Sequence, residues 1–397
     1  MLLVSSFLPY HNWDEVPYLY LSAHTSCAQS EQIRFYRDLK GILPGQVYEG
    51  AVRGDLYATL VTTDHDYFCS NLRFYTSRHL YIRGLRRLRA ISGDPMRAVR
   101  SLSILPAALG CGLLSFQIFG AKGLWRPGRA LLLLQTVWIF CLLGQLSTPD
   151  AAGIFFLAVG TALVTGSLAR RPVGKGMLQA IALGSAFTLA TAIRPTTSFT
   201  ALALAGALFV SPGSGRQRWL ALPVATGVLT GLGLDRAMQG SFAGLSDHLN
   251  HLTLWVFTFT DLLKPPFHAA GPLSDGLALH RLEAWIHAGR FAKRIWETYS
   301  ETLPTVLLQI SAVAFTALAA LGRCSRQGGG WTFQATLPDL VGRTMALAML
   351  GYIPFWMVYP MPDDRFFVAV PVVTTLLICL ADRQARGGLP PVGLDHG

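Results

Sequence analysis

Long uncharged apolar runs recur along this chain, and no other feature limits its fold as strongly. A helix that crosses the hydrocarbon core of a membrane needs roughly 17–25 apolar residues in succession. Nine runs of about that length are present, at residues 101–121, 130–149, 151–169, 176–193, 195–215, 219–234, 303–322, 344–362 and 366–381. The runs are continuously apolar and do not alternate with polar residues, which favours helices over the strands of a barrel. We therefore expect an all-α multi-pass membrane protein.

The overall composition supports this expectation. Hydrophobic residues make up 51% of the chain and charged residues only 14%, whereas soluble domains carry roughly 25% charged residues. A water-soluble fold is therefore disfavoured.

The N-terminus carries a shorter apolar stretch. Residues 1–8 are apolar but reach Pro9 after too few residues to cross a membrane. No basic region or small-residue cleavage site marks a signal peptide. We expect the end of a truncated first helix, and the alternative is an apolar terminus that lies on the membrane surface.

Clusters of basic residues predict the orientation of the helices. Four connections and the tail carry them, at residues 122–129, 170–175, 216–218, 323–326 and 383–386. They fall at alternate ends of the nine runs, which indicates cytoplasmic loops. One domain is then expected over residues 1–382, with long external segments at 10–100 and 239–302 and a cytoplasmic tail at 383–397. Arg194 is a departure, because it is a basic residue in a short external turn.

The net charge of +11 needs no nucleic-acid partner, since basic cytoplasmic loops account for much of it. No Walker loop or dinucleotide-binding glycine loop is present, which disfavours an ATP-driven pump.

Cysteine and histidine spacing gives little support for a metal site. Of six cysteines, only Cys27 and Cys69 lie where an oxidising compartment could join them. The sequence favours separate thiols there, and a disulfide stays open as the alternative. No CxxC or HExxH spacing occurs, so we expect no protein-bound metal.

Acidic residues stand at the expected external ends of the apolar runs. Asp14 and Glu15 follow the N-terminal stretch, and Asp150 lies in a short turn between two runs. Carboxylates at a hydrocarbon boundary are costly unless they are paired or used. Two acids on one face can divide the work of a transfer reaction, one of them accepting a proton. The plain alternatives are solvated charges for Asp14 and Glu15 and a helix N-cap for Asp150.

These elements together resemble a known family. Four elements carry the resemblance: the Asp14-Glu15 pair, the Thr148-Pro149-Asp150 turn, the element from Ile193 to Thr196 and a basic external helix. They are similar to elements of the GT-C glycosyltransferases. That family includes the protein O-mannosyltransferases and the aminoarabinose transferases of lipid A. The resemblance implies a GT-C-like helical bundle with interfacial helices in the first external loop, and polyprenyl-phosphate sugars as donors.

The resemblance also implies roles for the acids. Asp14 matches the catalytic base that acts on the acceptor, Glu15 its neighbour in the motif, and Asp150 the second acid of the external face. The His-Pro-Pro element of relatives is absent, although His65 and Asp66 lie where it is expected. These two residues are therefore the acceptor-side candidates.

Arginines are the candidates for holding the donor phosphate. Within residues 73–89, one helical face gathers aromatic and aliphatic residues, with Arg83, Arg86 and Arg87 opposite. This pattern predicts an interfacial helix, and the planar fork of arginine suits a phosphate. Arg365, before the last run, is the fourth candidate. The alternatives are simple attraction to anionic headgroups for the helix and an interfacial anchor for Arg365.

We therefore expect a glycosyltransferase in the inner (plasma) membrane that works at the external face without a cofactor. Its partners would be a polyprenyl-phosphate-linked sugar, a glycan, lipid or protein acceptor, and membrane lipids. A divalent cation beside Asp14 is compatible with the sequence but has no support in it. The competing hypotheses are a transporter or lipid flippase and a non-catalytic degenerate relative. The nine runs contain no charged residue inside them, which disfavours an ion-coupled carrier.

Overall fold

The computed structural model describes most of the chain up to residue 238 and part of the remainder. The described residues are 14–54, 56–76, 78–121, 126–146, 148–169, 176–210, 215–238, 326–327, 330–331, 340–344, 347–348 and 368–386. Regular structure in these ranges is helical, apart from the antiparallel pair β1 (Arg326–Gln327) and β2 (Gly330–Trp331). The expected all-α class is therefore confirmed for the described part of the chain.

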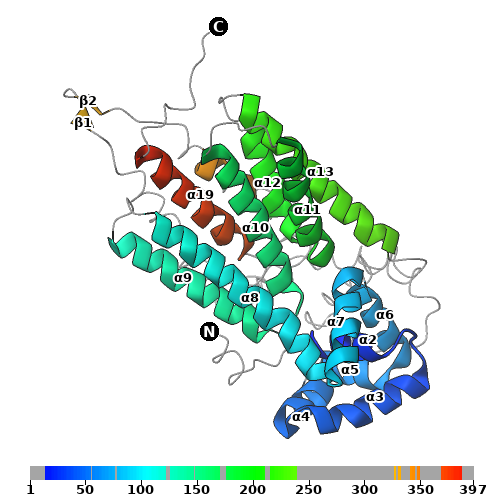
Figure 1. Ribbon diagram of the computed structural model, residues 1–397. Helices are drawn as coiled ribbons and strands as arrows, with labels where there is room; N and C mark the ends of the chain where they lie inside the picture. The colour runs from blue at the N-terminus through cyan, green and yellow to red at the C-terminus, as the bar shows by residue number, and fades with distance from the viewer. Residues whose placement is uncertain are drawn as a thin grey trace, which may run out of the picture.

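Six helices form an N-terminal lobe at one end of the molecule (Figure 1). They are α2 (Glu15–Ala23), α3 (Gln29–Ile42), α4 (Gly45–Arg53), α5 (Leu56–Thr63), α6 (His65–Thr76) and α7 (His79–Ser92). Their buried side chains make a core rich in tyrosine and leucine. Residues of the neighbouring bundle join it: Met96, Ala98, Val99, Ala152 and Ile193. The lobe and the bundle thus share a packed boundary.

The longer helices pack side by side as a bundle (Figure 1). They are α8 (Pro95–Gly120), α9 (Arg126–Gln145), α10 (Asp150–Ala169), α11 (Gly176–Ile193), α12 (Thr197–Val210), α13 (Gly215–Met238) and α19 (Ala369–Arg386). Four of them, α8, α9, α10 and α11, are long and apolar enough to cross a membrane. These helices indicate a membrane protein. Of the nine expected spans, 303–322 and most of 344–362 lie outside the described residues.

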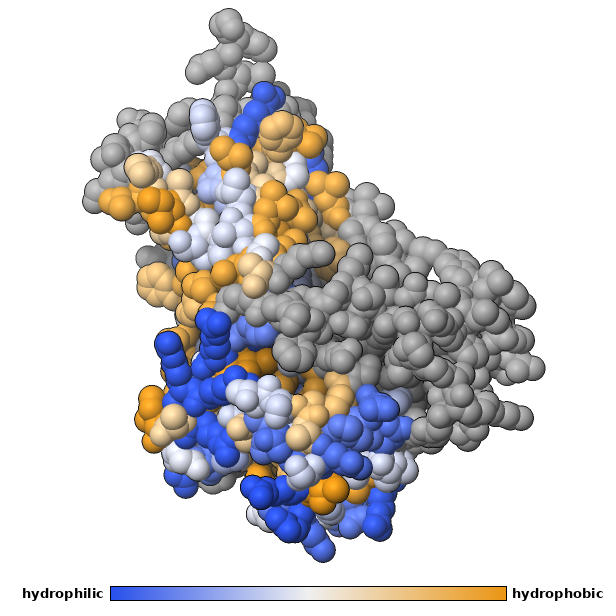
Figure 2. Space-filling model, turned by 90° about the vertical axis from the view of Figure 1, so that its right-hand side faces the viewer, coloured by the Kyte–Doolittle hydropathy of each residue, from blue (hydrophilic) through white to orange (hydrophobic). Residues whose placement is uncertain are grey.

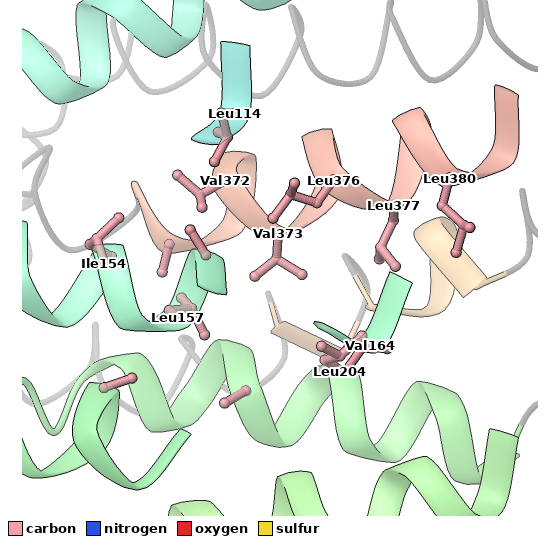
Figure 3. Close-up of a cluster of buried hydrophobic side chains, with 14 of the residues drawn as sticks. Leu114, Ile154, Leu157, Val164, Leu204, Val372, Val373, Leu376, Leu377 and Leu380 are labelled. Carbon is pink, nitrogen blue, oxygen red and sulfur yellow. The ribbon is translucent and has the colours of Figure 1, made fainter. Parts of the chain in front are cut away.

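The bundle is apolar inside and also on its outer surface. Leu114 of α8, Leu157 of α10 and Leu204 of α12 pack with Val372 and Leu376 of α19 in one buried cluster (Figure 3). On the outside of α8, Leu105, Leu109, Phe116 and Phe119 are exposed. Figure 2 shows the same contrast on one face, with hydrophobic colours over the bundle and hydrophilic colours gathered in the lobe. An apolar outer surface of this kind suits a lipid environment.

A tight turn connects the lobe to the bundle. Gly93 adopts a left-handed conformation with φ of 70°, which a glycine tolerates without steric cost. The Asp94 side chain then accepts hydrogen bonds from the backbone amides of Met96 and Arg97, and Pro95 opens the helix. These start signals explain why α8 begins six residues before the apolar run that predicted it.

The predicted interfacial helix over residues 73–89 is corrected by the structure. The chain leaves helical geometry at Arg78 and forms α6 before it and α7 after it. Tyr81 and Leu85, which belong to the apolar face of that pattern, are buried in the core of the lobe. The wheel pattern identified an apolar face correctly, but that face packs against protein, because α7 lies against α2 and α8.

Candidate functional site

Asp14 and its partners form the first half of a polar cluster in the lobe. Asp14 directly precedes α2 and does not cap it; instead its Oδ1 accepts a hydrogen bond of 2.5 Å from the Tyr75 hydroxyl on α6. Arg78 Nη1 donates to the hydroxyl oxygen of Tyr18, one turn along α2. The Arg78 guanidinium also lies 5.8 Å and 5.5 Å from the ring centroids of Tyr18 and Tyr75. Asp14 is therefore held among two tyrosines and a buried arginine.

Asp150 and Arg194 form the second half, at the end of the bundle. Asp150 is the first residue of α10, and Arg194 directly follows α11. Asp150 Oδ1 lies 2.7 Å from Arg194 Nη2, at salt-bridge distance, without the alignment of a hydrogen bond. Both side chains are buried, with 1% and 4% of their residue surface exposed. The Thr148 hydroxyl donates to the other carboxylate oxygen at 2.5 Å.

Local structure explains why these two charges meet. A carboxylate at a helix N-terminus and a cation at a helix C-terminus each have the sign that the backbone dipoles favour. Gly153 lies one turn into α10, and a Cβ there would stand 2.4 Å from Cβ of Arg194. The glycine therefore allows the arginine to approach the helix closely.

Electrostatics connect the two halves into one cluster. Burial raises the pKa of Tyr18 well above its ordinary value; the charges of Arg78 and Arg194 act to lower it, and those of Asp14 and Asp150 act to raise it. Burial tends to lower the pKa of Arg78, but Tyr18, Asp14, Tyr75 and Asp150 more than offset this, so its pKa is raised. Two acids separated by 136 positions (150 minus 14) thus act on the same groups.

Glu15 lies at the edge of this cluster. Only 1% of its surface is exposed, so the alternative of a solvated charge is wrong for this residue. Its charge acts on Tyr81, whose pKa burial raises well above its ordinary value. The Tyr81 ring packs edge-on against Tyr18 at 5.1 Å. Glu15 is therefore a buried neighbour of the cluster, and its charge acts on Tyr81.

The polar residues at this boundary can perform acid–base and charge-stabilising chemistry. We call them the acid–arginine cluster, which consists of Asp14, Tyr18, Tyr75, Arg78, Asp150 and Arg194. A carboxylate held by a tyrosine hydroxyl is a proton acceptor of fixed orientation. A buried guanidinium supplies positive charge in a poorly solvated place, where it acts strongly on a nearby anion. The arrangement suits proton removal from one group beside stabilisation of a negative charge on another.

The donor-phosphate candidates lie elsewhere. Arg83 and Arg87 are exposed on α7. Arg86 donates from Nε to the Leu21 carbonyl at 2.9 Å and from Nη2 to the His24 carbonyl at 2.8 Å, at the end of α2 remote from Asp14. Arg365 lies outside the described residues. The structure does not bring Arg83, Arg86 and Arg87 together with the acids.

The acceptor-side candidates are also remote from the acids. His65 Nδ1 contacts Gln32 Oε1 at 2.9 Å, and Asp66 is exposed. His65 and Tyr75 lie ten residues apart on α6 (75 minus 65), about 15 Å along a helix. His65 therefore lies far along α6 from the tyrosine that contacts Asp14.

The expectation of separate thiols at Cys27 and Cys69 is wrong. The two form a disulfide, with their Cα atoms 5.8 Å apart, although 42 residues separate them in sequence. It ties α6 to the connection between α2 and α3.

Four members of the cluster were not assigned to it from the sequence. Arg78 was counted with the interfacial helix, and Tyr18 and Tyr75 carry no motif. Arg194 did give a signal, since it is a basic residue on the side where the loop charges predict none. Its ion pair with Asp150 explains that departure.

The fold and the site define a class of protein: a helical membrane protein with a buried acid–arginine cluster between a small lobe and a bundle. No protein-family model, curated protein or solved structure matches the chain.

Proposed function

We propose that this protein is a membrane glycosyltransferase that transfers a sugar from a polyprenyl-phosphate donor to an acceptor hydroxyl, with Asp14 as the base. One observation carries the proposal. The GT-C resemblance singles out two acids, Asp14 of the Asp-Glu pair and Asp150 of the Thr-Pro-Asp turn. Asp14 accepts a hydrogen bond from Tyr75, whose ring lies 5.5 Å from the Arg78 guanidinium, and Asp150 lies 2.7 Å from Arg194. The neighbours of the second pair, Ala152 and Ile193, pack in the core of the lobe that holds the first. The fold is proposed to be a GT-C-like bundle that the remaining apolar runs complete.

The chemistry assigns one task to each charge. Asp14 accepts the proton of the acceptor hydroxyl as its oxygen attacks the anomeric carbon. The bond from that carbon to the phosphate oxygen breaks, and the electron pair leaves with the polyprenyl phosphate. Arg78 stabilises the negative charge on the departing phosphate. No cofactor enters these steps, and inversion at the anomeric carbon rests on the family resemblance.

The other residues of the cluster position Asp14 and Arg78. The Tyr75 hydroxyl orients the Asp14 carboxylate, and Tyr18 holds the Arg78 guanidinium. Asp150 balances Arg194, and breaking a buried pair by removing one partner costs about 3–5 kcal/mol. We place the cluster at the external face of the inner (plasma) membrane, because the basic loops are expected on the other side.

The test is transfer of radiolabelled sugar from a panel of polyprenyl-phosphate donors in membranes that contain the protein. We expect Asp14→Asn to abolish transfer at unchanged protein level, because an amide cannot accept the proton. Asp38→Asn is the matched control, since Asp38 is an exposed acid of the same lobe, and it should leave transfer unchanged. Full transfer by Asp14→Asn would remove Asp14 as the base. No transfer with any donor would favour a transporter or a non-catalytic protein.

A further inference from the structure

A second cluster of reactive side chains, Cys27, His65 and Cys69, lies in the lobe. Cys27 lies between α2 and α3, and His65 and Cys69 lie four residues apart on α6, on one face of that helix. The two sulfurs and one ring nitrogen all lie within 4.8 Å of one another, and all three side chains are half-buried. The disulfide occupies two of these three positions in the structure.

The His65 imidazole is oriented by a buried amide. Gln32 Nε2 donates to the backbone carbonyls of Val61 at 3.2 Å and Thr62 at 3.3 Å. The Gln32 oxygen must therefore be the atom that faces His65, where it accepts from Nδ1–H at 2.9 Å. The hydrogen on Nδ1 leaves the lone pair on Nε2, and Nε2 lies 3.6 Å from Cys69 Sγ. Histidine ligands of metals are commonly oriented by a partner of this kind.

The spacing agrees with that of a zinc site. Zinc binds cysteine sulfur at about 2.3 Å and histidine nitrogen at about 2.0–2.1 Å, which at a tetrahedral angle separates the two ligand atoms by roughly 3.5 Å. The Nε2 to Sγ distance of 3.6 Å already has this value. The two sulfurs must separate, to about 3.8 Å by the same geometry, and Cys27 Sγ, which already lies within 4.8 Å of the ring nitrogen, must settle at the distance of a zinc ligand.

We propose that Cys27, His65 and Cys69 form a redox-gated zinc site, in which the disulfide and the zinc-bound dithiolate are alternative states. An external dithiol supplies two electrons and two protons to the disulfide and is itself oxidised to a disulfide. The two protein thiols then lose their protons as Zn²⁺ binds both sulfurs and His65 Nε2, and water completes the fourth position. In both states α6 stays tied to the connection between α2 and α3.

The test uses the full chain in detergent with Co²⁺ as the probe. The protein is reduced, freed of reductant without air, and titrated. We expect a thiolate-to-cobalt absorption band that saturates at one equivalent, disappears on adding Zn²⁺, and is absent from the oxidised protein. Cys27→Ser and Cys69→Ser should abolish the band. Cys111→Ser and Cys141→Ser are matched controls that should retain it, since these cysteines lie on α8 and α9.

Gln32 provides an independent test, because it is placed to orient His65 and does not contact the metal. Gln32→Leu should weaken Co²⁺ binding about 10–100-fold, as loss of an orienting partner does elsewhere. Near-ultraviolet circular dichroism of the tyrosine-rich lobe monitors folding throughout. The proposal fails if Cys27→Ser keeps the cobalt absorption band, or if reduced protein with an intact circular dichroism spectrum shows no band. It also fails if reduction abolishes the circular dichroism spectrum and Zn²⁺ does not restore that spectrum. Recovery with Zn²⁺ supports it.

Discussion

At the scale of single residues, the acids were predictable and their partners were not. Asp14 and Asp150 stand in short motifs beside apolar runs, so their chemistry can be read from neighbouring sequence. Tyr75 and Arg78 contact Asp14 and Tyr18 only because α6 and α7 fold back onto α2. Contacts across more than fifty positions depend on tertiary packing, which local periodicity does not encode.

Gly153 gives a direct test of the close approach between α10 and Arg194. Gly153→Ala introduces a Cβ that would stand 2.4 Å from Cβ of Arg194, so we expect a loss of about 1–3 kcal/mol from overpacking. Gly166→Ala is the control on the same helix, because nothing lies within 4 Å of the added Cβ. Thermal unfolding in detergent measures both. Equal melting temperatures for the two variants would contradict the close approach.

Tyr20 predicts how the lobe responds to alkali. Burial, followed by the charge of Glu31 and a hydrogen bond to it, raises the pKa of Tyr20 to about 12, against about 10 in an unfolded chain. A raised pKa contributes stability that is complete below pH 10 and is lost as the pH rises toward 12. We expect Tyr20→Phe, which keeps the ring against Phe35 and Phe68, to lose less stability across that interval.

The measurement for Tyr20 is the melting temperature in detergent at several pH values, with tyrosinate absorbance recorded in parallel. Parallel pH profiles for the wild type and Tyr20→Phe would show that this hydroxyl does not contribute to alkaline unfolding.

At the scale of elements, the apolar runs predicted the bundle helices well and the lobe poorly. Helix α11 has the bounds of the run that predicted it, because a span is defined by its own residues and the thickness of a membrane. The helices of the lobe are short, and Arg78 separates α6 from α7. An amphipathic face can pack on lipid or on protein, and periodicity alone does not distinguish the two.

Variants on α7 distinguish an arginine that stabilises the fold from an arginine that binds the donor phosphate. Arg86→Met removes two hydrogen bonds to the last carbonyls of α2 and its following turn, and we expect a loss of about 1–3 kcal/mol. Arg87→Met changes an exposed side chain of the same helix and should leave the melting temperature unchanged. Both variants should retain sugar transfer when folded. If Arg87→Met lost sugar transfer at unchanged stability, the donor phosphate would instead be assigned to the exposed face of α7.

At the scale of the whole molecule, the proposed orientation in the membrane has a direct test. Asp38→Cys places a thiol on an exposed position of the lobe, and Arg218→Cys places one on an exposed position in the first turn of α13, at the end of the helix expected to be cytoplasmic. We expect a membrane-impermeant thiol reagent to label Asp38→Cys in intact cells and Arg218→Cys only after permeabilisation. The reverse pattern would place the lobe inside and remove the external-face chemistry.

The disulfide has a consequence for the order in which this molecule matures. Cys69 and Tyr75 lie six residues apart on α6 (75 minus 69), about 9 Å along one rigid helix. Cross-linking Cys69 to Cys27 restricts the rotation of that helix about its axis, and with it the direction in which the Tyr75 hydroxyl points. Under the external orientation proposed above, we therefore expect closure of this cross-link in an oxidising compartment to precede the final alignment of Asp14.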